Sequence, residues 1–329
     1  MNRQWIYARK PVGELTPDAF EMRHGDVPQT QPGKAVVRVR AVSIDPAQRA
    51  WMLVRTYRPK LEPGELMPAF AIGEVVASQA PDLKLGDLVS GNLGWQDYAL
   101  LTPSQLRLRD KSRPLEHVIG ALSNTGLAAY FGLLHVGRPL PGQTVLVSGA
   151  GGAVGCIVVQ IAKIAGCRVV AVAGGAEKCR WVAATLGADA TVDYRSRDLY
   201  PAMKAACPDG IDVYFDNTGG EILEVALALM NQNGCVVCCG AVSQYNNADW
   251  NGQTRGVPGL LIAKRIRMEG YIQSDYERHR PLAEKSLSRW IDDGRLQAPV
   301  QVIEGLEHAP QALVDLLRGA NFGKLMVRV

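Results

Sequence analysis

The stretch TVLVSGAGGAVGCIVVQIAKIAGCRVVAVA, residues 144–173, decides how this chain folds. It begins as a short apolar strand, turns through Gly149, Gly151, Gly152 and Gly155, and continues with helical spacing before a second apolar strand. Glycine lets such a turn adopt positive φ and approach a pyrophosphate, and the N-terminus of the helix favours an anion. A strand, a glycine turn and a helix in this order predict a dinucleotide-binding unit.

The same alternation continues toward the C-terminus. Alternation at this spacing predicts right-handed crossovers and a doubly wound parallel sheet covered by helices on both faces, an α/β fold. The further elements that we expect are a helix over 176–187, strands over 190–194 and 211–217, a helix from about Glu221, a strand over 234–241 and an amphipathic helix over 279–294.

The N-terminal part has a different pattern. Residues 34–44, KAVVRVRAVSI, alternate apolar and polar side chains, which is typical of a half-buried strand. Short strand-like pieces separated by turn residues follow, so the first ~120 residues are predicted to form a mainly β domain, a partly open barrel. The tail 323–329, GKLMVRV, is strand-like again and is expected to return to this domain.

The tip of the strand over 167–173 predicts the choice of cofactor. An acid there would accept hydrogen bonds from the ribose hydroxyls of NAD and repel a 2′-phosphate. This strand ends instead on Ala173, followed by Gly174 and Gly175. Lys178 is close enough in sequence to pair with the phosphate, so NADP is favoured over NAD.

Other charged residues near this tip leave alternatives open. Arg180, Tyr194 and Arg197 are close enough in sequence to help Lys178, which is otherwise an ordinary surface lysine. Glu177 is the rival acid for the ribose, although its place in the first turn of a helix is explained equally well by the helix dipole.

Motifs along the whole chain resemble those of one family, the zinc-independent medium-chain dehydrogenases/reductases, and within it the NADPH-dependent alkenal, prostaglandin and curcumin reductases. The matching stretches are SIDPAQR (43–49), NTGLAAYFGL (124–133), GAVGCIVVQIAK (152–163), GGAEK (174–178), YFDNTGGE (214–221), CGAVSQYN (239–246), MEGYI (268–272) and ANFGKLMV (320–327).

The resemblance implies a two-domain organisation. Residues 1–121 and 295–329 would form a GroES-like, mainly β catalytic domain, and residues 122–294 a Rossmann NADP-binding domain. Members of the family are commonly homodimers that extend their sheets across the interface, and IRMEGYI (266–272) is the expected edge strand.

The resemblance also implies a set of cofactor contacts. Asn217 and Asn321 stand beside glycines and could instead cap turns, because asparagine tolerates such conformations. The implied contacts are Gly152, Ala153, Val154 and Gly155 for the pyrophosphate, Lys178 and Tyr194 for the 2′-phosphate, and Asn217, Cys239, Ser243, Tyr245, Tyr271, Ile272 and Asn321 near the ribose and nicotinamide.

The implied activity is NADPH-dependent reduction of the activated C=C bond of an α,β-unsaturated ketone or aldehyde. Tyr245 would face the developing enolate oxygen, since a phenol donates a hydrogen bond without a pKa shift. The alternative for Tyr245 is a pocket wall without a chemical role. The alternatives for the whole chain are an NADPH:quinone oxidoreductase and a non-catalytic NADPH-binding protein.

The expected substrate pocket departs from the family pattern. Many members have a tyrosine at the position of Ala47, and losing that ring is expected to reshape the pocket. Trp51 and Tyr57 are further candidate walls beside Tyr245, with membership of the core as their alternative. The substrate is expected to be a small-molecule enone or alkenal.

Composition excludes several other functions. The 36 basic and 32 acidic residues are mixed along the chain, so nucleic-acid binding is not expected. Without a signal-like N-terminus or an apolar stretch of ~20 residues, we expect a cytoplasmic protein with no membrane association. No cysteine precedes Cys156, and Ile72-Gly73-Glu74 stands where zinc-dependent relatives have Gly-His-Glu, so no metal is predicted.

Overall fold

The structure, a computed structural model, describes residues 1–195, 198–246 and 257–329. Its contacts form two compact units: Met1–Ile119 with Val300–Ala320 and Leu325–Val329, and Gly120–Pro299 with Asn321–Lys324. The sequence put the boundaries after residues 121 and 294 and gave the whole tail to the first domain. The segment Asn321–Lys324 joins the second unit because it hydrogen-bonds to the glycine turn, as described below.

The second unit alternates strands and helices along the chain. Its strands are β8 (Thr144–Val147), β9 (Arg168–Ala173), β10 (Ala190–Asp193), β11 (Ile211–Asp216), β12 (Met230–Cys238) and β13 (Arg267–Gly270). Its helices are α3 (Asn124–Phe131), α4 (Ala153–Ile164), α5 (Ala176–Leu186), α6 (Leu199–Ala206), α7 (Gly220–Leu229), α8 (Val257–Lys264) and α9 (Arg280–Asp292).

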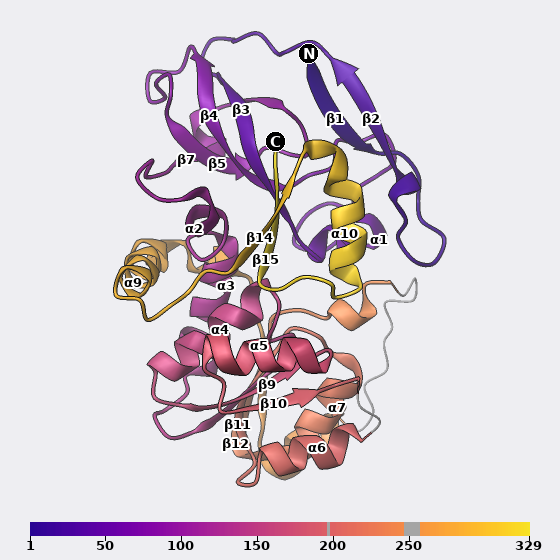
Figure 1. Cartoon of the computed structure of the whole chain (residues 1–329), viewed down its shortest axis with the longest axis vertical. Helices are drawn as coiled ribbons and strands as arrows, with labels where there is room; N and C mark the ends of the chain where they lie inside the picture. The colour runs from indigo at the N-terminus through magenta and orange to yellow at the C-terminus, as the bar shows by residue number, and fades with distance from the viewer. Residues whose placement is uncertain (196–197, 247–256) are drawn as a thin grey trace. The chain divides into compact units, whose positions relative to one another are not determined.

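Within the described residues these strands form a six-stranded parallel sheet in the order β10-β9-β8-β11-β12-β13. Side chains alternate between its faces. Val145 and Val147 pack into the core that carries α4 and α5, whereas Leu146 packs with α6 and α7 on the other face. The predicted doubly wound α/β fold is confirmed, and the ribbon shows helices on both faces of the sheet (Figure 1).

The first unit is mainly β, as the sequence predicts. Its strands are β1 (Asn2–Tyr7), β2 (Phe20–Gly25), β3 (Ala35–Ile44), β4 (Phe70–Ser78), β5 (Leu88–Asn92), β6 (Tyr98–Leu101), β7 (Leu106–Leu108), β14 (Val300–Glu304) and β15 (Lys324–Arg328). Its helices are α1 (Ala47–Leu53), α2 (Leu115–Ile119) and α10 (Ala309–Leu317).

The tail completes the sheet of the first unit. β15 pairs antiparallel with β3, where Leu325 lies opposite Ile44 and Val327 opposite Val42. In the sheet, β14-β15-β3-β4-β5-β7 follow one another and β6 pairs with β3, while β1 and β2 form a separate two-stranded sheet. The sheet of the first unit therefore contains strands from both ends of the chain, and the tail forms a strand of this sheet.

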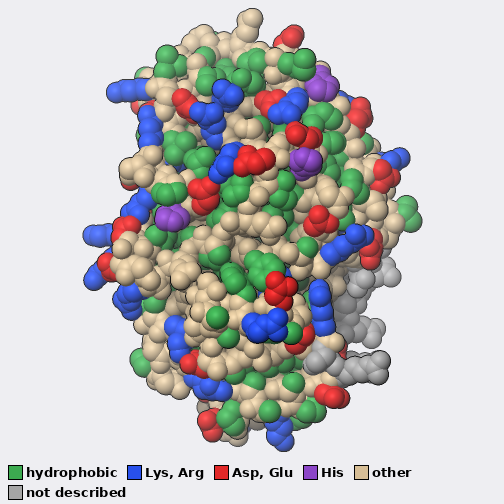
Figure 2. All heavy atoms as spheres, viewed as in Figure 1, with side chains coloured by type: hydrophobic (Ala, Val, Ile, Leu, Met, Phe, Trp, Pro, Cys, Tyr) green, Lys and Arg blue, Asp and Glu red, His purple; other side chains and the backbone are tan. Residues whose placement is uncertain are grey.

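The surface carries both signs of charge. On the face drawn in Figure 2, Lys and Arg side chains are interspersed with Asp and Glu. No helix within the described ranges is long and apolar enough to cross a membrane.

Candidate functional site

The glycine-rich turn lies between β8 and α4, where the sequence predicts a pyrophosphate site. Gly149 has a φ of 57°, and a Cβ added to Gly155 would lie 2.2 Å from the Gly149 carbonyl oxygen. Both positions therefore require glycine. Gly152 begins α4 without a side-chain cap, and a helix leaves its first-turn amides, such as those of Ala153 and Val154, without intrahelical partners. These amides suit a phosphate group.

A segment from the far end of the chain closes onto this turn. The Gly323 N–H donates to the Gly151 carbonyl over 2.8 Å, and Gly152 and Gly323 form an isolated parallel bridge. Asn321 is buried, and its Nδ2 donates to the Gly323 carbonyl over 2.7 Å. This bond is the turn-capping role that the sequence offered as the alternative for Asn321. Contact of Asn321 with a cofactor stays a prediction.

Lys178 lies in the first turn of α5 and reaches back over the glycine turn. A Cβ on Gly151 would lie 2.5 Å from Lys178 Cδ, so the aliphatic stem of the lysine crosses the turn at this glycine. Its ammonium lies 5.1 Å from the centre of the Phe322 ring. Burial, and then the positive charge of Arg195, lower the pKa of Lys178. Glu177, the rival acid, is exposed in the same first turn.

Tyr194 and Arg195 follow β10 and lie beside the tip of β9. The Tyr194 N–H donates to the Ala173 carbonyl over 3.1 Å, and a Cβ on Gly174 would meet both side chains. Arg195 was missed from the sequence, although the parallel pairing of the strands over 168–173 and 190–194 was the signal for it. Arg180 is exposed on α5, and Arg197 lies outside the described residues.

Asp216, at the carboxyl end of β11, was also missed. Its side chain is 2% exposed, and its Oδ1 accepts hydrogen bonds from the Tyr214 hydroxyl at 2.7 Å and the Ser148 hydroxyl at 3.1 Å. The same oxygen accepts from the backbone amides of Thr218 at 2.9 Å and Gly219 at 2.8 Å. One carboxylate therefore ties the end of β8 to the loop that follows β11.

Replacing Asp216 with Ala is expected to destabilise the protein by about 3 kcal/mol or more, because it leaves several buried donors without an acceptor. Urea unfolding followed by circular dichroism measures the loss as a lower midpoint. Glu221→Ala removes an exposed acid close by and serves as the control. Equal midpoints for the two variants would show that Asp216 does not organise this loop.

Hydrogen bonds to the neighbouring loops hold Asn217 and Ser243 in place. The Asn217 side-chain Nδ2 donates to the Ser148 carbonyl over 2.7 Å, and its backbone N–H donates to the Ser148 hydroxyl over 2.9 Å. The Ser243 hydroxyl donates to the Thr218 carbonyl over 2.6 Å. The structure thus brings the loops after β8, β11 and β12 together at the carboxyl edge of the sheet, where open α/β folds bind ligands.

Tyr245 lies in the loop that leaves β12, one residue after the short 3-10 helix Val242–Gln244. Its phenolic oxygen accepts a hydrogen bond from the Ala241 backbone N–H at 3.4 Å. This bond uses a lone pair of the oxygen and does not consume the O–H proton. The geometry is compatible with a phenol that donates to a substrate, and that role stays a prediction.

Comparisons with known proteins agree with this architecture. Residues 3–108 match a family model described as the N-terminal domain of oxidoreductase, and residues 153–288 match one described as zinc-binding dehydrogenase. The chain is 37% identical over 334 residues to the NADPH-dependent curcumin reductase of Escherichia coli, covering 100% of this chain and 97% of that protein. The chain is a zinc-independent medium-chain dehydrogenase/reductase.

Two further matches place this medium-chain dehydrogenase/reductase in the alkenal, prostaglandin and curcumin reductase-like family. It is 40% identical over 301 residues to the 2-alkenal reductase (NADP(+)-dependent) of Nicotiana tabacum, covering 89% of this chain and 87% of that protein. The crystal structure of CurA in complex with NADPH from Vibrio vulnificus has a TM-score of 0.95 at 34% identity, covering 99% of each chain. The resemblance found in the sequence is confirmed, and membership makes the chain an NADP-dependent oxidoreductase.

The zinc-binding description of one family model does not apply to the residues of this chain. Its sequence has no cysteine before Cys156 and lacks the Gly-His-Glu motif of the zinc-dependent enzymes. Among the described residues, no three His, Cys, Asp or Glu side chains gather as a metal site.

Cys239 and Tyr271, two predicted cofactor contacts, are partly buried and pack against the core of the second unit. Burial raises the pKa of the Cys239 thiol to about 11 and that of Cys238 to about 12, so both are protonated at neutral pH. The Tyr271 hydroxyl donates to the Ala128 carbonyl over 2.6 Å. These contacts describe packing roles, and cofactor contacts through Tyr271 and its neighbour Ile272 stay predictions.

The predicted substrate-pocket residues are divided between the two units. Ala47, Trp51 and Tyr57 belong to the first unit, on α1 and the loop after it, whereas Tyr245 belongs to the second. Trp51 is 9% exposed and Tyr57 is 62% exposed, and their rings meet edge-on with centres 6.4 Å apart. Trp51 is therefore largely a core residue, and the exposed Tyr57 is the better candidate for touching a substrate.

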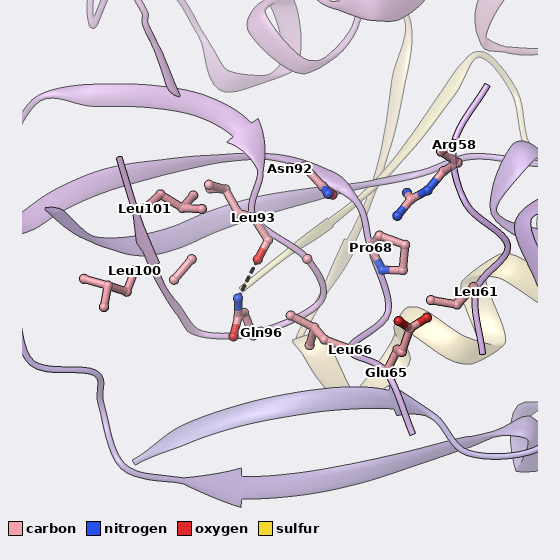
Figure 3. A pocket seen from close by; sticks show the side chains of 12 residues that line it. Arg58, Leu61, Glu65, Leu66, Pro68, Asn92, Leu93, Gln96, Leu100 and Leu101 are labelled. Carbon is pink, nitrogen blue, oxygen red and sulfur yellow. Dashed lines mark hydrogen bonds between the residues drawn. The ribbon is translucent and has the colours of Figure 1, made fainter. Parts of the chain in front are cut away.

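A pocket of about 460 Å³ also lies within the first unit (Figure 3). Leucines, including Leu61 and Leu93, line much of it, and the Arg58 guanidinium points into it (Figure 3). Arg58 also covers the Trp51 ring at 4.4 Å. None of the four predicted substrate-pocket residues lines this pocket.

Proposed function

We propose that this reductase uses NADPH to reduce the C=C bond of α,β-unsaturated ketones and aldehydes. The observation that carries the proposal is Tyr245, whose phenol lies on the loop leaving β12. The same loop carries Ser243 and is hydrogen-bonded to the loop of Asn217 and Thr218. The proposal is supported by relatives named for the reduction of curcumin and 2-alkenals. The site residues and the substrate class are parts of this proposal.

NADPH, when bound, supplies the hydride that adds to the β-carbon. The residues of this chain bind the cofactor and orient the substrate. The first-turn amides of α4, from Ala153 to Gly155, would hold the pyrophosphate beside Gly152, and Lys178 would pair with the 2′-phosphate. Tyr245 donates a hydrogen bond to the carbonyl oxygen, where negative charge develops as the enolate forms. A proton from water then adds to the α-carbon of the enolate, which restores the carbonyl and completes the reduction.

The proposal includes a small-molecule enone or alkenal as substrate, a cytoplasmic location and a homodimer. β13, within the segment named from the sequence as the interface strand, is at the edge of the parallel sheet. Its outer backbone groups could pair with the same strand of a second copy, as the family resemblance implies.

Turnover of two substrate classes tests the proposal. The protein is mixed with NADPH and either a medium-chain enone or a quinone, and the loss of NADPH absorbance is followed. We expect oxidation of NADPH with the enone and formation of the saturated ketone, identified by mass spectrometry. Turnover with the quinone alone would assign a quinone oxidoreductase instead. NADPH binding without turnover across a panel of enones and alkenals would assign a non-catalytic protein.

A further inference from the structure

The residues that follow β9 and β10 lie close together, and one of them, Arg195, is not among the predicted cofactor contacts. The two strands pair in parallel, with Asp193 opposite Ala173, so the residues that follow each strand leave the sheet side by side. On one side these residues are Gly174 and Gly175, and on the other Tyr194 and Arg195. The 2′-phosphate of NADP is expected at this edge.

Asp193 joins the two tips through one carboxylate oxygen. Its Oδ1 accepts hydrogen bonds from the backbone N–H of Gly175 at 2.8 Å and from that of Arg195 at 3.0 Å. The oxygen is thereby committed to backbone amides, although Asp193 is the acid at the end of the strand next to β9. The bonds also fix the backbone of Arg195 relative to the loop after β9.

The side chain of Arg195 lies over the two glycines. A Cβ on Gly174 would lie 3.0 Å from Arg195 Nε, and one on Gly175 would lie 3.9 Å from Arg195 Nη1. The guanidinium carbon is 5.9 Å from the centre of the Tyr194 ring. Gly174 is therefore needed for the close approach of Arg195 and Tyr194, in addition to leaving room for a phosphate.

The charge of Arg195 also reaches Lys178. The charge of Arg195 contributes to lowering the pKa of Lys178, second to burial. Two cations held this close repel each other, and a dianion bound between them would remove the repulsion. A guanidinium is well suited to that anion, because its planar fork donates two parallel hydrogen bonds to phosphate oxygens.

We propose that Arg195 is a second cation for the 2′-phosphate of NADPH, in addition to Lys178, and that it contributes to the preference for NADPH over NADH. Asp193 acts as the positioning residue that holds Arg195 beside Gly174 and Gly175. This inference rests on NADPH as the cofactor within the proposed function, and it is independent of the substrate.

Equilibrium binding without substrate tests the inference. Dissociation constants for NADPH and NADH are measured by fluorescence titration for the wild type, Arg195→Gln, Arg195→Lys and Arg289→Gln. Arg195 is exposed, so we expect a tenfold effect rather than a larger one: Arg195→Gln weakens NADPH binding about tenfold and leaves NADH binding unchanged. Arg195→Lys restores part of the affinity for NADPH.

Arg289→Gln is the matched control, because it removes an exposed arginine from α9 in the same unit and is expected to leave both affinities unchanged. An equal loss of NADPH and NADH binding in Arg195→Gln would overturn the proposal, as would an effect of Arg289→Gln as large as that of Arg195→Gln. Thermal unfolding of the unliganded variants shows that they are folded. Since no turnover is measured, failure of this inference is distinct from failure of the proposed reductase activity.

Discussion

Lys178→Ala is expected to weaken NADPH binding about a hundredfold and to change NADH binding far less. Lys178 is half-buried, with its stem across Gly151 and its ammonium near Phe322. A charge-assisted hydrogen bond to the 2′-phosphate from such a position is worth about 2–3 kcal/mol. NADH lacks that phosphate, so the loss should fall on NADPH. Isothermal titration with each cofactor measures both affinities.

Lys178→Met is the sharper companion variant. Methionine keeps an apolar chain over Gly151 but removes the charge, so it separates the phosphate contact from packing over the turn. We expect Lys178→Met to discriminate against NADPH about as strongly as Lys178→Ala. If both variants weaken the two cofactors equally, Lys178 acts by shaping the turn and does not recognise the phosphate.

Tyr245→Phe is expected to lower kcat/KM for an enone about a hundredfold while NADPH affinity is unchanged. Removing one well-placed donor to a developing oxyanion typically costs this much, because its hydrogen bond is stronger in the transition state than in the ground state. Phenylalanine keeps the ring, so the shape of the loop after β12 is preserved. Steady-state kinetics with a medium-chain enone, together with NADPH titration, measure both quantities.

Tyr200→Phe provides the control for Tyr245→Phe, because Tyr200 is an exposed tyrosine on α6. It should react like the wild type. Unchanged turnover in Tyr245→Phe would reduce Tyr245 to a wall of the pocket, which is the alternative considered from the sequence. A raised KM with unchanged kcat would also indicate a binding role instead of donation to the transition state.

The burial of the predicted substrate-pocket residues is a property that local sequence does not encode. Trp51 and Tyr57 are six residues apart and both aromatic, yet one is buried and the other exposed. Local sequence does not distinguish them, because burial depends on what packs against α1. Arg58, which covers Trp51, has no signal in the sequence that would have linked the two.

The sequence by itself determined the alternation of strands and helices, the glycine turn at 149–155 and the missing acid after Ala173. These features depend on residues that are neighbours along the chain, so hydrophobic periodicity and glycine spacing are enough to read them. The order of the elements along the chain followed from the same local pattern.

Only the tertiary structure decided which distant residues complete the site. Parallel register placed Arg195 over Gly174, and one buried carboxylate, Asp216, collected donors from two loops. The tail returned Gly323 to the Gly151 carbonyl from the far end of the chain. Strand register and chain return are set by packing of the whole sheet, and no local pattern encodes them.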